Sequence, residues 1–318
     1  MALSNQAADG AAVRHVAWLY RTPEEFVAGV SEYAEAGDPV VVALRPGPLL
    51  GRVRSDTVTV LDLAELGRNP ARLMPVLRGF ADEHPGRRIR VLAELAWPGR
   101  SAAELGEITR YEAMLELAFA GVPVTIVCLY SEAELAASTI FAARGAHRRL
   151  LRAGREFDSA DFPAGAERRS RIGGPLLIPP GARSLAYERD LRPVRALVGA
   201  VAAQAGLSAD RRADLVIAAS EVAANTLKHT AGGGAVRVWA TDDEVLCQLE
   251  DSGHITDPLA GYRRPATDAA AGHGLWLVNQ VCDLAEIRTG ETGTTIRLHM
   301  QRSVTGTGLP QVTHVTTA

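Results

Sequence analysis

The apolar pattern of this chain changes once along its length, at a segment rich in proline and glycine between residues 157 and 180. Before this segment, short apolar runs alternate with stretches of helical periodicity. After it, two helical stretches precede pairs of short strands. A segment of this composition forms neither a helix nor a central strand, and it acts as a semi-stiff linker. The change of pattern therefore predicts two folded domains with different arrangements of helices and strands.

The length of the chain agrees with two domains, since 318 residues exceed the usual reach of one hydrophobic core. We predict a disordered N-terminus over residues 1–12, a first domain over 13–165, a linker over 166–180, a second domain over 181–302 and a flexible tail over 303–318.

Strands and helices alternate in the first domain. Strands are expected over 16–20, 39–44, 57–62, 88–93 and 122–129, with helices beginning at Thr22 and spanning 70–83 and 101–120. This alternation favours a mainly parallel sheet that is covered on both faces. The loop after the second strand, Arg45-Pro46-Gly47-Pro48-Leu49, stands where a P-loop ATPase would hold phosphate. A P-loop needs a lysine after its glycine, and the only lysine of the chain is Lys228, so that site is excluded.

The second domain has a different pattern. A strand is expected near 185–188, followed by helices over 191–205 and 207–230 and by hairpins that pair 235–240 with 245–250 and 284–289 with 294–300. Two helices followed by mostly antiparallel strands favour an α/β sandwich instead of a doubly wound fold.

The composition excludes several classes of protein. A hydrophobic share of 47% beside 22% charged residues is typical of a globular protein. The net charge of −3 argues against direct nucleic-acid binding by phosphate neutralisation. The three cysteines, Cys128, Cys247 and Cys282, lack the spacing of a zinc or redox motif. No apolar run reaches about 18 residues and no leader pattern is present, so we expect a cytoplasmic protein that does not enter a membrane.

The helix over 207–230 carries the first candidate site. Glu221 and Asn225 are one turn apart and share a face of this helix. A carboxamide oxygen can hold a Mg²⁺ ion that carries phosphate, which leaves the carboxylate free to accept a proton. The same spacing is also typical of a solvated helix face. Lys228, one turn further on, would either approach a phosphate or stay in solvent.

Three glycine-containing motifs follow this helix. Asp251-Ser252-Gly253 comes directly after a strand, where a buried acid can accept the exocyclic amine of adenine, although Asp-Ser-Gly also forms a plain Asx turn. The irregular stretch 254–271 is long enough for a mobile lid. It ends at Gly272-His273-Gly274-Leu275, where the N–H groups of a helix start suit a polyphosphate. Finally, Gly293-Thr294-Thr295 places hydroxyl groups at the start of the last strand.

The order of these four motifs resembles the N, G1, G2 and G3 boxes of the GHKL, or Bergerat-fold, ATPases, and more narrowly the anti-sigma regulatory factors that are serine kinases. The resemblance spans about residues 181–302 and implies ATP and Mg²⁺ as cofactors. It implies that Asn225 holds the Mg²⁺ ion and that Glu221 is the base that takes the proton from a substrate serine. It further implies nucleotide contacts from Lys228, Asp251, Gly253, Gly272, Gly274, Leu275, Thr294 and Thr295.

One residue departs from that family pattern. Kinases of this type often carry DxGxG, whereas Ile255 replaces the second glycine here. A β-branched residue stiffens the loop and removes a position that can take positive φ. We therefore expect altered nucleotide affinity or altered closure of the lid.

The first domain resembles the MEDS sensory domain over about residues 13–165. The resemblance is carried by the order of its elements and by His15, the tryptophan-containing segment 94–99, Tyr111-Glu112, Cys128-Leu129-Tyr130 and His147. It implies a RecA-like sheet without a P-loop that binds a small-molecule effector. The ligand-lining residues would be His15, Glu112, Cys128, Tyr130 and His147, each of which taken singly also reads as an ordinary core or surface residue. Because no two ligands are close in sequence, the pattern does not favour a metal site.

Together these resemblances imply an anti-sigma factor that is a serine/threonine-protein kinase acting in stress-response transcription. It would bind ATP and phosphorylate an anti-anti-sigma partner of the STAS type, under the control of a ligand bound by the first domain. One alternative is a non-catalytic switch that sequesters a sigma factor when ATP is bound. Another is a sensor whose ATPase domain has decayed at Ile255. No paired dimerisation helices with a phosphoacceptor histidine precede residue 185, which argues against a histidine kinase, although the family suggests a homodimer.

Overall fold

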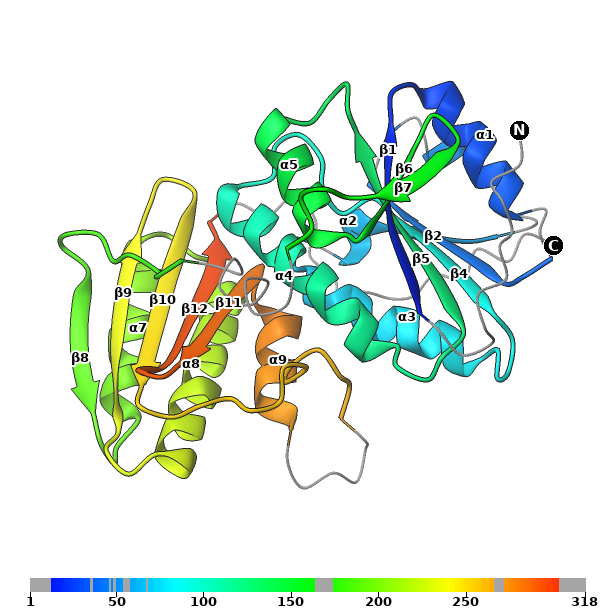
Figure 1. Ribbon diagram of the computed structural model, residues 1–318. Coiled ribbons are helices and arrows are strands. Elements are labelled where there is room, and N and C mark those ends of the chain that lie inside the picture. Colours follow the sequence, from blue (N-terminus) through cyan, green and yellow to red (C-terminus); the bar gives the residue numbers. More distant parts are fainter. Residues whose placement is uncertain are drawn as a thin grey trace. The chain divides into compact units, whose positions relative to one another are not determined.

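The computed structural model describes residues 13–163, apart from gaps at 35–36, 46, 48–49, 54–57 and 67, together with residues 174–265 and 272–302. The chain divides into two compact units near residue 172, and each unit has one sheet (Figure 1). The predicted disordered N-terminus, the flexible tail and most of the predicted linker lie outside the described residues. The exact domain boundaries therefore stay a prediction.

The first unit contains a seven-stranded sheet in the order β3-β2-β4-β5-β1-β6-β7. Its strands are β1 (Arg14–Tyr20), β2 (Val40–Leu44), β3 (Thr59–Asp62), β4 (Ile89–Ala93), β5 (Val124–Ser131), β6 (Arg149–Arg152) and β7 (Arg155–Asp158). All neighbouring pairs are parallel except β6 and β7. Strands β2 and β5 are buried along their whole length, as central strands covered on both faces should be. The predicted mainly parallel sheet is confirmed.

Helices cover both faces of this sheet. They are α1 (Pro23–Ala34), α2 (Leu63–Leu66), α3 (Leu73–Asp82), α4 (Ala102–Ala118) and α5 (Ala137–Ala146), with 3₁₀ turns η1 (Leu50–Arg52) and η2 (Pro70–Arg72). In Figure 1, α1 lies on one side of the sheet, and α3 and α4 lie on the other. At the helix start expected at Thr22, its Oγ1 accepts from the Glu25 N–H, and Ser101 and Glu104 form a capping box at the start of α4.

The sequence interpretation missed the end of this unit, where α5, β6 and β7 form. Strands β6 and β7 are joined by Ala153 and Gly154, which have φ values of 50° and 71°. A two-residue hairpin turn of this kind usually shows Asn-Gly or Asp-Gly, because other residues rarely adopt positive φ. Alanine at the first position therefore hid the turn.

The second unit is a two-layer α/β sandwich. Its antiparallel sheet has the order β11-β12-β10-β9-β8. The strands are β8 (Arg183–Tyr187), β9 (Gly234–Ala240), β10 (Glu244–Asp251), β11 (Leu284–Gly290) and β12 (Gly293–Gln301), and the helices are α7 (Arg192–Gln204), α8 (Ala209–His229) and α9 (His273–Val281). One hydrophobic core joins one face of the sheet to all three helices. Figure 1 shows α7 and α8 side by side along that face.

Helix α8 sets the position of the candidate site. Ser208 begins it, with its side chain accepting from the Arg211 N–H at 3.3 Å. Its fully buried stripe includes Ala219, Val222 and Ala223, so the helix packs on the sheet through small residues. Glu221 and Asn225 are half-buried at the edge of that stripe.

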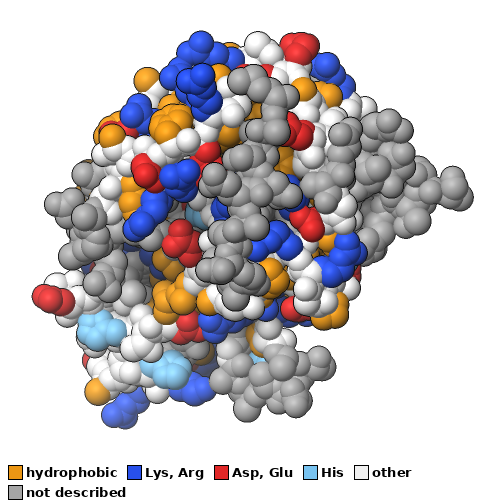
Figure 2. All heavy atoms as spheres, turned by 45° about the vertical axis from the view of Figure 1, so that its right-hand side comes forward, with side chains coloured by type: hydrophobic (Ala, Val, Ile, Leu, Met, Phe, Trp, Pro, Cys, Tyr) orange, Lys and Arg blue, Asp and Glu red, His pale blue; other side chains and the backbone are white. Residues whose placement is uncertain are grey.

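Exposed charged side chains of both signs lie close to one another. On the face shown in Figure 2, Lys and Arg (blue) are interspersed with Asp and Glu (red). Many form ion pairs, such as Arg149 with Glu156 and Asp158, both at 2.9 Å. Exposed pairs of this kind contribute little to stability. Among the described residues, no helix combines the length and the apolar character that crossing a bilayer requires.

The far face of the second sheet holds a buried charged group. Residues alternate along β12, so Leu298 faces the helices and His299 faces away from them. His299 Nδ1 lies 3.0 Å from Glu244, and its Nε2 lies 3.0 Å from Glu286. Burial disfavours the charged imidazolium, but the two carboxylates outweigh burial and raise the pKa of His299 to about 9.

This raised pKa makes the stability of the second unit depend on pH. The contribution of His299 is fully present below its unfolded pKa of about 6.5 and is lost as the pH rises through about 9. We expect an NMR titration of the His299 ring to show a midpoint near 9, with the His299→Gln variant assigning the signal. A midpoint near the ordinary value would contradict the protonated arrangement.

Candidate functional site

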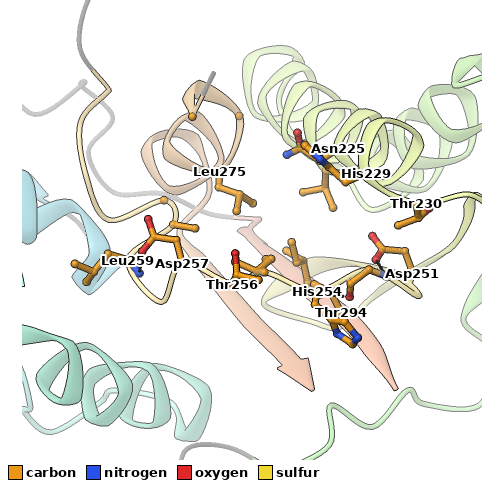
Figure 3. A pocket seen from close by; sticks show the side chains of 18 of the residues that line it. Asn225, His229, Thr230, Asp251, His254, Thr256, Asp257, Leu259, Leu275 and Thr294 are labelled. Atoms are coloured by element: carbon orange, nitrogen blue, oxygen red, sulfur yellow. Dashed lines mark hydrogen bonds between the residues drawn. The ribbon is translucent and has the colours of Figure 1, made fainter. Parts of the chain in front are cut away.

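A cavity of about 460 Å³ lies in the second unit between α8, α9, the strand ends and the loop that follows β10. Its volume is in the range of small-molecule sites. Figure 3 shows Asn225 from α8, Leu275 from α9, and Asp251 and Thr294 from the strand ends around it. The cavity brings together most of the residues that the motifs predict: Asn225, Asp251, Gly253, Gly272, Gly274, Leu275 and Thr294.

Asp251 is held by two hydrogen bonds from different parts of the chain. The Gly253 N–H donates to its Oδ1 at 2.7 Å, which forms the Asx turn, and Thr226 Oγ1 donates to its Oδ2 at 2.6 Å. The Tyr187 hydroxyl in turn donates to Thr226 Oγ1 at 3.1 Å. Burial raises the pKa of Tyr187 to about 12, so this hydroxyl keeps its proton at neutral pH. The Asx turn at Asp251 therefore also forms part of the cavity wall. Each oxygen of the Asp251 carboxylate retains a lone pair for a ligand.

Glu221 and Asn225 meet α9 at Gly274. A Cβ atom at position 274 would lie 3.1 Å from Asn225 Nδ2 and 3.2 Å from Glu221 Oε2. Glycine therefore lets the first turn of α9 approach both side chains closely. Glu221 does not line the cavity itself, but this contact places it beside Asn225 at the cavity edge. Lys228 is exposed and does not line the cavity.

The two threonines of the last motif separate onto opposite faces of β12. Thr294 is buried, and its hydroxyl donates to the Gly253 carbonyl at 2.8 Å. Thr295 points to the other face and does not line the cavity, because side chains alternate along a strand. Gly293 has a φ of 127°, and a Cβ atom there would stand 2.0 Å from the Asp251 carbonyl oxygen. Only glycine allows the two strand ends to meet in this way.

In the first unit, the structure brings the predicted sensory residues together in the core. His15 Nε2 lies 3.3 Å from Cys128 Sγ, and the His15 and His147 ring centroids are 4.2 Å apart. The Tyr130 hydroxyl donates to Glu112 Oε1 at 2.5 Å. Burial, with the Glu112 carboxylate nearby, raises the pKa of the Cys128 thiol and of the Tyr130 hydroxyl. All five side chains are buried.

Comparison with protein families agrees with these two arrangements. Residues 14–148 match the family model described as MEDS, the MEthanogen/methylotroph, DcmR Sensory domain. Residues 185–300 match the model of the histidine kinase-like ATPase domain. The chain joins a MEDS domain to a histidine kinase-like ATPase domain. No curated protein matches the chain.

Among solved structures, the RsbU and RsbW domains of Rv1364c from Mycobacterium tuberculosis are similar to this chain at 23% sequence identity. The similarity covers 39% of this chain and 34% of that chain, with a TM-score of 0.30. The chain thus spans about a third of the length of that relative.

In the ATPase domain, Ile255 is fixed on two sides. Its N–H donates to Thr289 Oγ1 at 3.1 Å, and its side chain packs against the hydrophobic core while lining the cavity. Thr289 also lies 3.0 Å from the Thr294 hydroxyl. The described part of the predicted lid, 254–265, is further anchored where Asn279 Nδ2 donates to the Gly261 carbonyl at 3.1 Å. The remainder of that lid, 266–271, lies outside the described residues.

The sequence interpretation missed the residues that position the cavity wall through hydrogen bonds. These are Tyr187, Thr226, Thr289 and Asn279. Thr226 offered one signal, since a threonine adjacent to Asn225 falls on the buried stripe of the helix, where a hydroxyl needs a partner. Thr289, Tyr187 and Asn279 gave none, because their partners are distant in sequence.

We predict that Thr226→Val destabilises the ATPase domain by about 1–3 kcal/mol, because Asp251 loses a donor and the buried Tyr187 hydroxyl loses its acceptor. Valine has nearly the same shape, so packing is preserved. Urea unfolding followed by circular dichroism measures the effect. The matched control is Thr295→Val on the opposite face of β12, for which we expect a change within about 0.5 kcal/mol. Equal effects in the two variants would show that the hydrogen bonds do not matter.

Proposed function

We propose that the cavity of the ATPase domain binds ATP together with Mg²⁺. The observation that carries this proposal is the contact at Gly274, where the start of α9 lies against Asn225 and Glu221 without an intervening side chain. Together with Asp251, which lines the same cavity of about 460 Å³, it supplies groups suited to the base and to the phosphates of a nucleotide. The residues present therefore fit the cofactor that the fold family implies.

Asp251 would accept the exocyclic amine of adenine, since the Thr226 and Gly253 hydrogen bonds fix its carboxylate in place. Asn225 would offer its carboxamide oxygen to Mg²⁺. The backbone N–H groups of Gly272 and Gly274, at the start of α9, would meet the phosphates. When bound, the nucleotide with its metal supplies the phosphoryl group and part of the charge neutralisation that its transfer needs.

We propose further that Glu221 is the general base for transfer to a protein hydroxyl. Its carboxylate is half-buried beside Asn225 and is therefore within reach of a serine presented at the cavity edge. It would take the proton of that serine hydroxyl as the oxygen becomes a nucleophile.

The protein would thus be an anti-sigma factor of the serine/threonine-kinase type that phosphorylates a STAS-type anti-anti-sigma partner. Its MEDS domain would adjust this activity in response to a small effector.

A second candidate function follows from Ile255. Because its backbone is tied to Thr289 and its side chain packs on the core, the loop after Asp251 is restrained where related kinases often carry a glycine. A restrained loop suits a protein that holds ATP without transferring phosphate. In that case bound nucleotide would fix the conformation that sequesters a sigma factor.

Nucleotide binding can be tested at Asp251. We expect Asp251→Asn to weaken ATP binding by at least about tenfold, because one charged acceptor becomes an amide. Isothermal titration calorimetry with ATP and Mg²⁺ measures the affinity. Asp242→Asn, in the exposed turn between β9 and β10, is the matched control and should bind as tightly as the wild type. Equal affinity in the wild type and both variants would exclude Asp251 from the site.

Phosphate transfer can be tested at Glu221. With γ-labelled ATP and a STAS-type anti-anti-sigma protein, the wild type should produce phosphoserine. Glu221→Gln should lower the rate by about 10²–10⁴ while ATP still binds. Glu188→Gln, at an exposed position of the same domain, should leave the rate unchanged. Labelling that persists in Glu221→Gln would refute the assigned base. A wild type that binds ATP without labelling its partner would favour the non-catalytic switch.

A further inference from the structure

Three metal-ligating side chains converge in the core of the MEDS domain. They are His15 on β1, Cys128 on β5 and His147 at the end of α5. One ligand atom from each lies within 4.8 Å of the other two, and all three residues are buried. They come from separate elements, which is why the sequence showed no local ligand pair.

The hydrogen bond of His147 determines which of its nitrogens is available to a ligand. Its Nδ1 donates to the Ala143 carbonyl at 2.8 Å, so in the neutral imidazole the lone pair is on Nε2. This Nε2 is buried and, among the described residues, has no hydrogen-bond partner. Metal-binding histidines are typically oriented in this way, with the other ring N–H bonded to a carbonyl or carboxylate. The arrangement therefore indicates that His147 Nε2 can bind a metal ion.

The set of donors selects the type of ion. Two imidazoles and one thiolate suit a borderline ion such as Zn²⁺, whose Zn–N and Zn–S distances of about 2.0–2.3 Å place ligand atoms roughly 3.4–3.6 Å apart. The 3.3 Å between His15 Nε2 and Cys128 Sγ is close to that separation. The ligand atom of His147 lies within 4.8 Å of the other two, so a small side-chain movement would bring all three to the separations of a bound ion.

The surroundings of these ligands are also suitable. Glu112 lies beside Cys128 and is fixed by the Tyr130 hydroxyl at 2.5 Å. A cation would offset this buried carboxylate, which burial alone disfavours. Three protein ligands leave a fourth position open, as in zinc sites that bind a further molecule.

We propose that His15, Cys128 and His147 bind one Zn²⁺ ion in the MEDS domain, and that its open fourth position takes a small effector with an oxygen, nitrogen or sulfur donor. On binding, the Cys128 thiol loses its proton to solvent and its sulfur becomes a thiolate ligand. The site is independent of the proposed nucleotide site. The sequence did not favour a metal site among these residues, and the proposal reverses that expectation.

The test uses the full chain expressed in medium supplemented with zinc or, in parallel, cobalt, because the buried ligands take up metal most readily during folding. After dialysis with a thiol-free reductant, metal content is measured by mass spectrometry. We expect one zinc ion per chain. The cobalt form should show a thiolate-to-cobalt charge-transfer band in the near ultraviolet.

Variants identify the ligands. Cys128→Ser should remove the charge-transfer band, and His147→Gln should lower zinc affinity by at least about tenfold. Cys247→Ser, which changes an equally buried cysteine of the ATPase domain, should leave both unchanged. If Cys128→Ser does not fold, the wild-type spectrum and His147→Gln still decide the outcome. A wild type without bound metal, or a full equivalent of zinc retained in both ligand variants, would overturn the proposal.

Discussion

The hydrogen bond from Thr226 to Asp251 joins the two layers of the ATPase domain at the point where its cavity begins. Thr226 lies on the buried stripe of α8, and Asp251 ends β10, so this bond fixes the distance between helix and sheet. Both partners are satisfied further, by Tyr187 on β8 and by the Gly253 N–H. A buried polar chain of this kind is stabilising only when each member has a partner. Here it determines where Asn225 stands relative to Asp251.

Two glycines, which have no side chain, allow the elements beside this hydrogen bond to approach closely. Gly293 lets β12 pass against the Asp251 carbonyl, and Gly274 lets α9 pass against Asn225 and Glu221. Larger residues would separate these elements and open the core, because protein interiors have no spare volume. The same two glycines thus serve packing and access to the cavity. Because a Cβ atom would crowd its neighbours at these two positions, the glycine motifs indicate the site more clearly than any charged residue does.

The sequence predicted those features that depend on short separations. The spacing of Glu221 and Asn225 on one helix and the glycines that open α9 are local patterns, and the alternation of strands and helices is a local pattern as well. The Asx turn of Asp251 is local, but its distant support was not predictable, because Thr226 reaches the Asp251 carboxylate and Tyr187 reaches Thr226 only once the sheet has formed. Thr295 shows the limit of motif reasoning, since the pleat of β12 turns it away from the cavity. The core cluster of the MEDS domain likewise depends on strand order that periodicity does not reveal.

The two sites differ in how complete they are without a ligand. Both oxygens of Asp251 already have donors within the chain, so the ATPase domain can fold fully before nucleotide arrives. His147 Nε2, in contrast, is buried without a hydrogen-bond partner in the described part of the chain, and such a group costs free energy until a ligand satisfies it. An ion that binds only the folded state adds its binding free energy to folding. Loss of the proposed Zn²⁺ ion would therefore destabilise the MEDS domain itself, whereas loss of the proposed nucleotide would leave the ATPase fold intact.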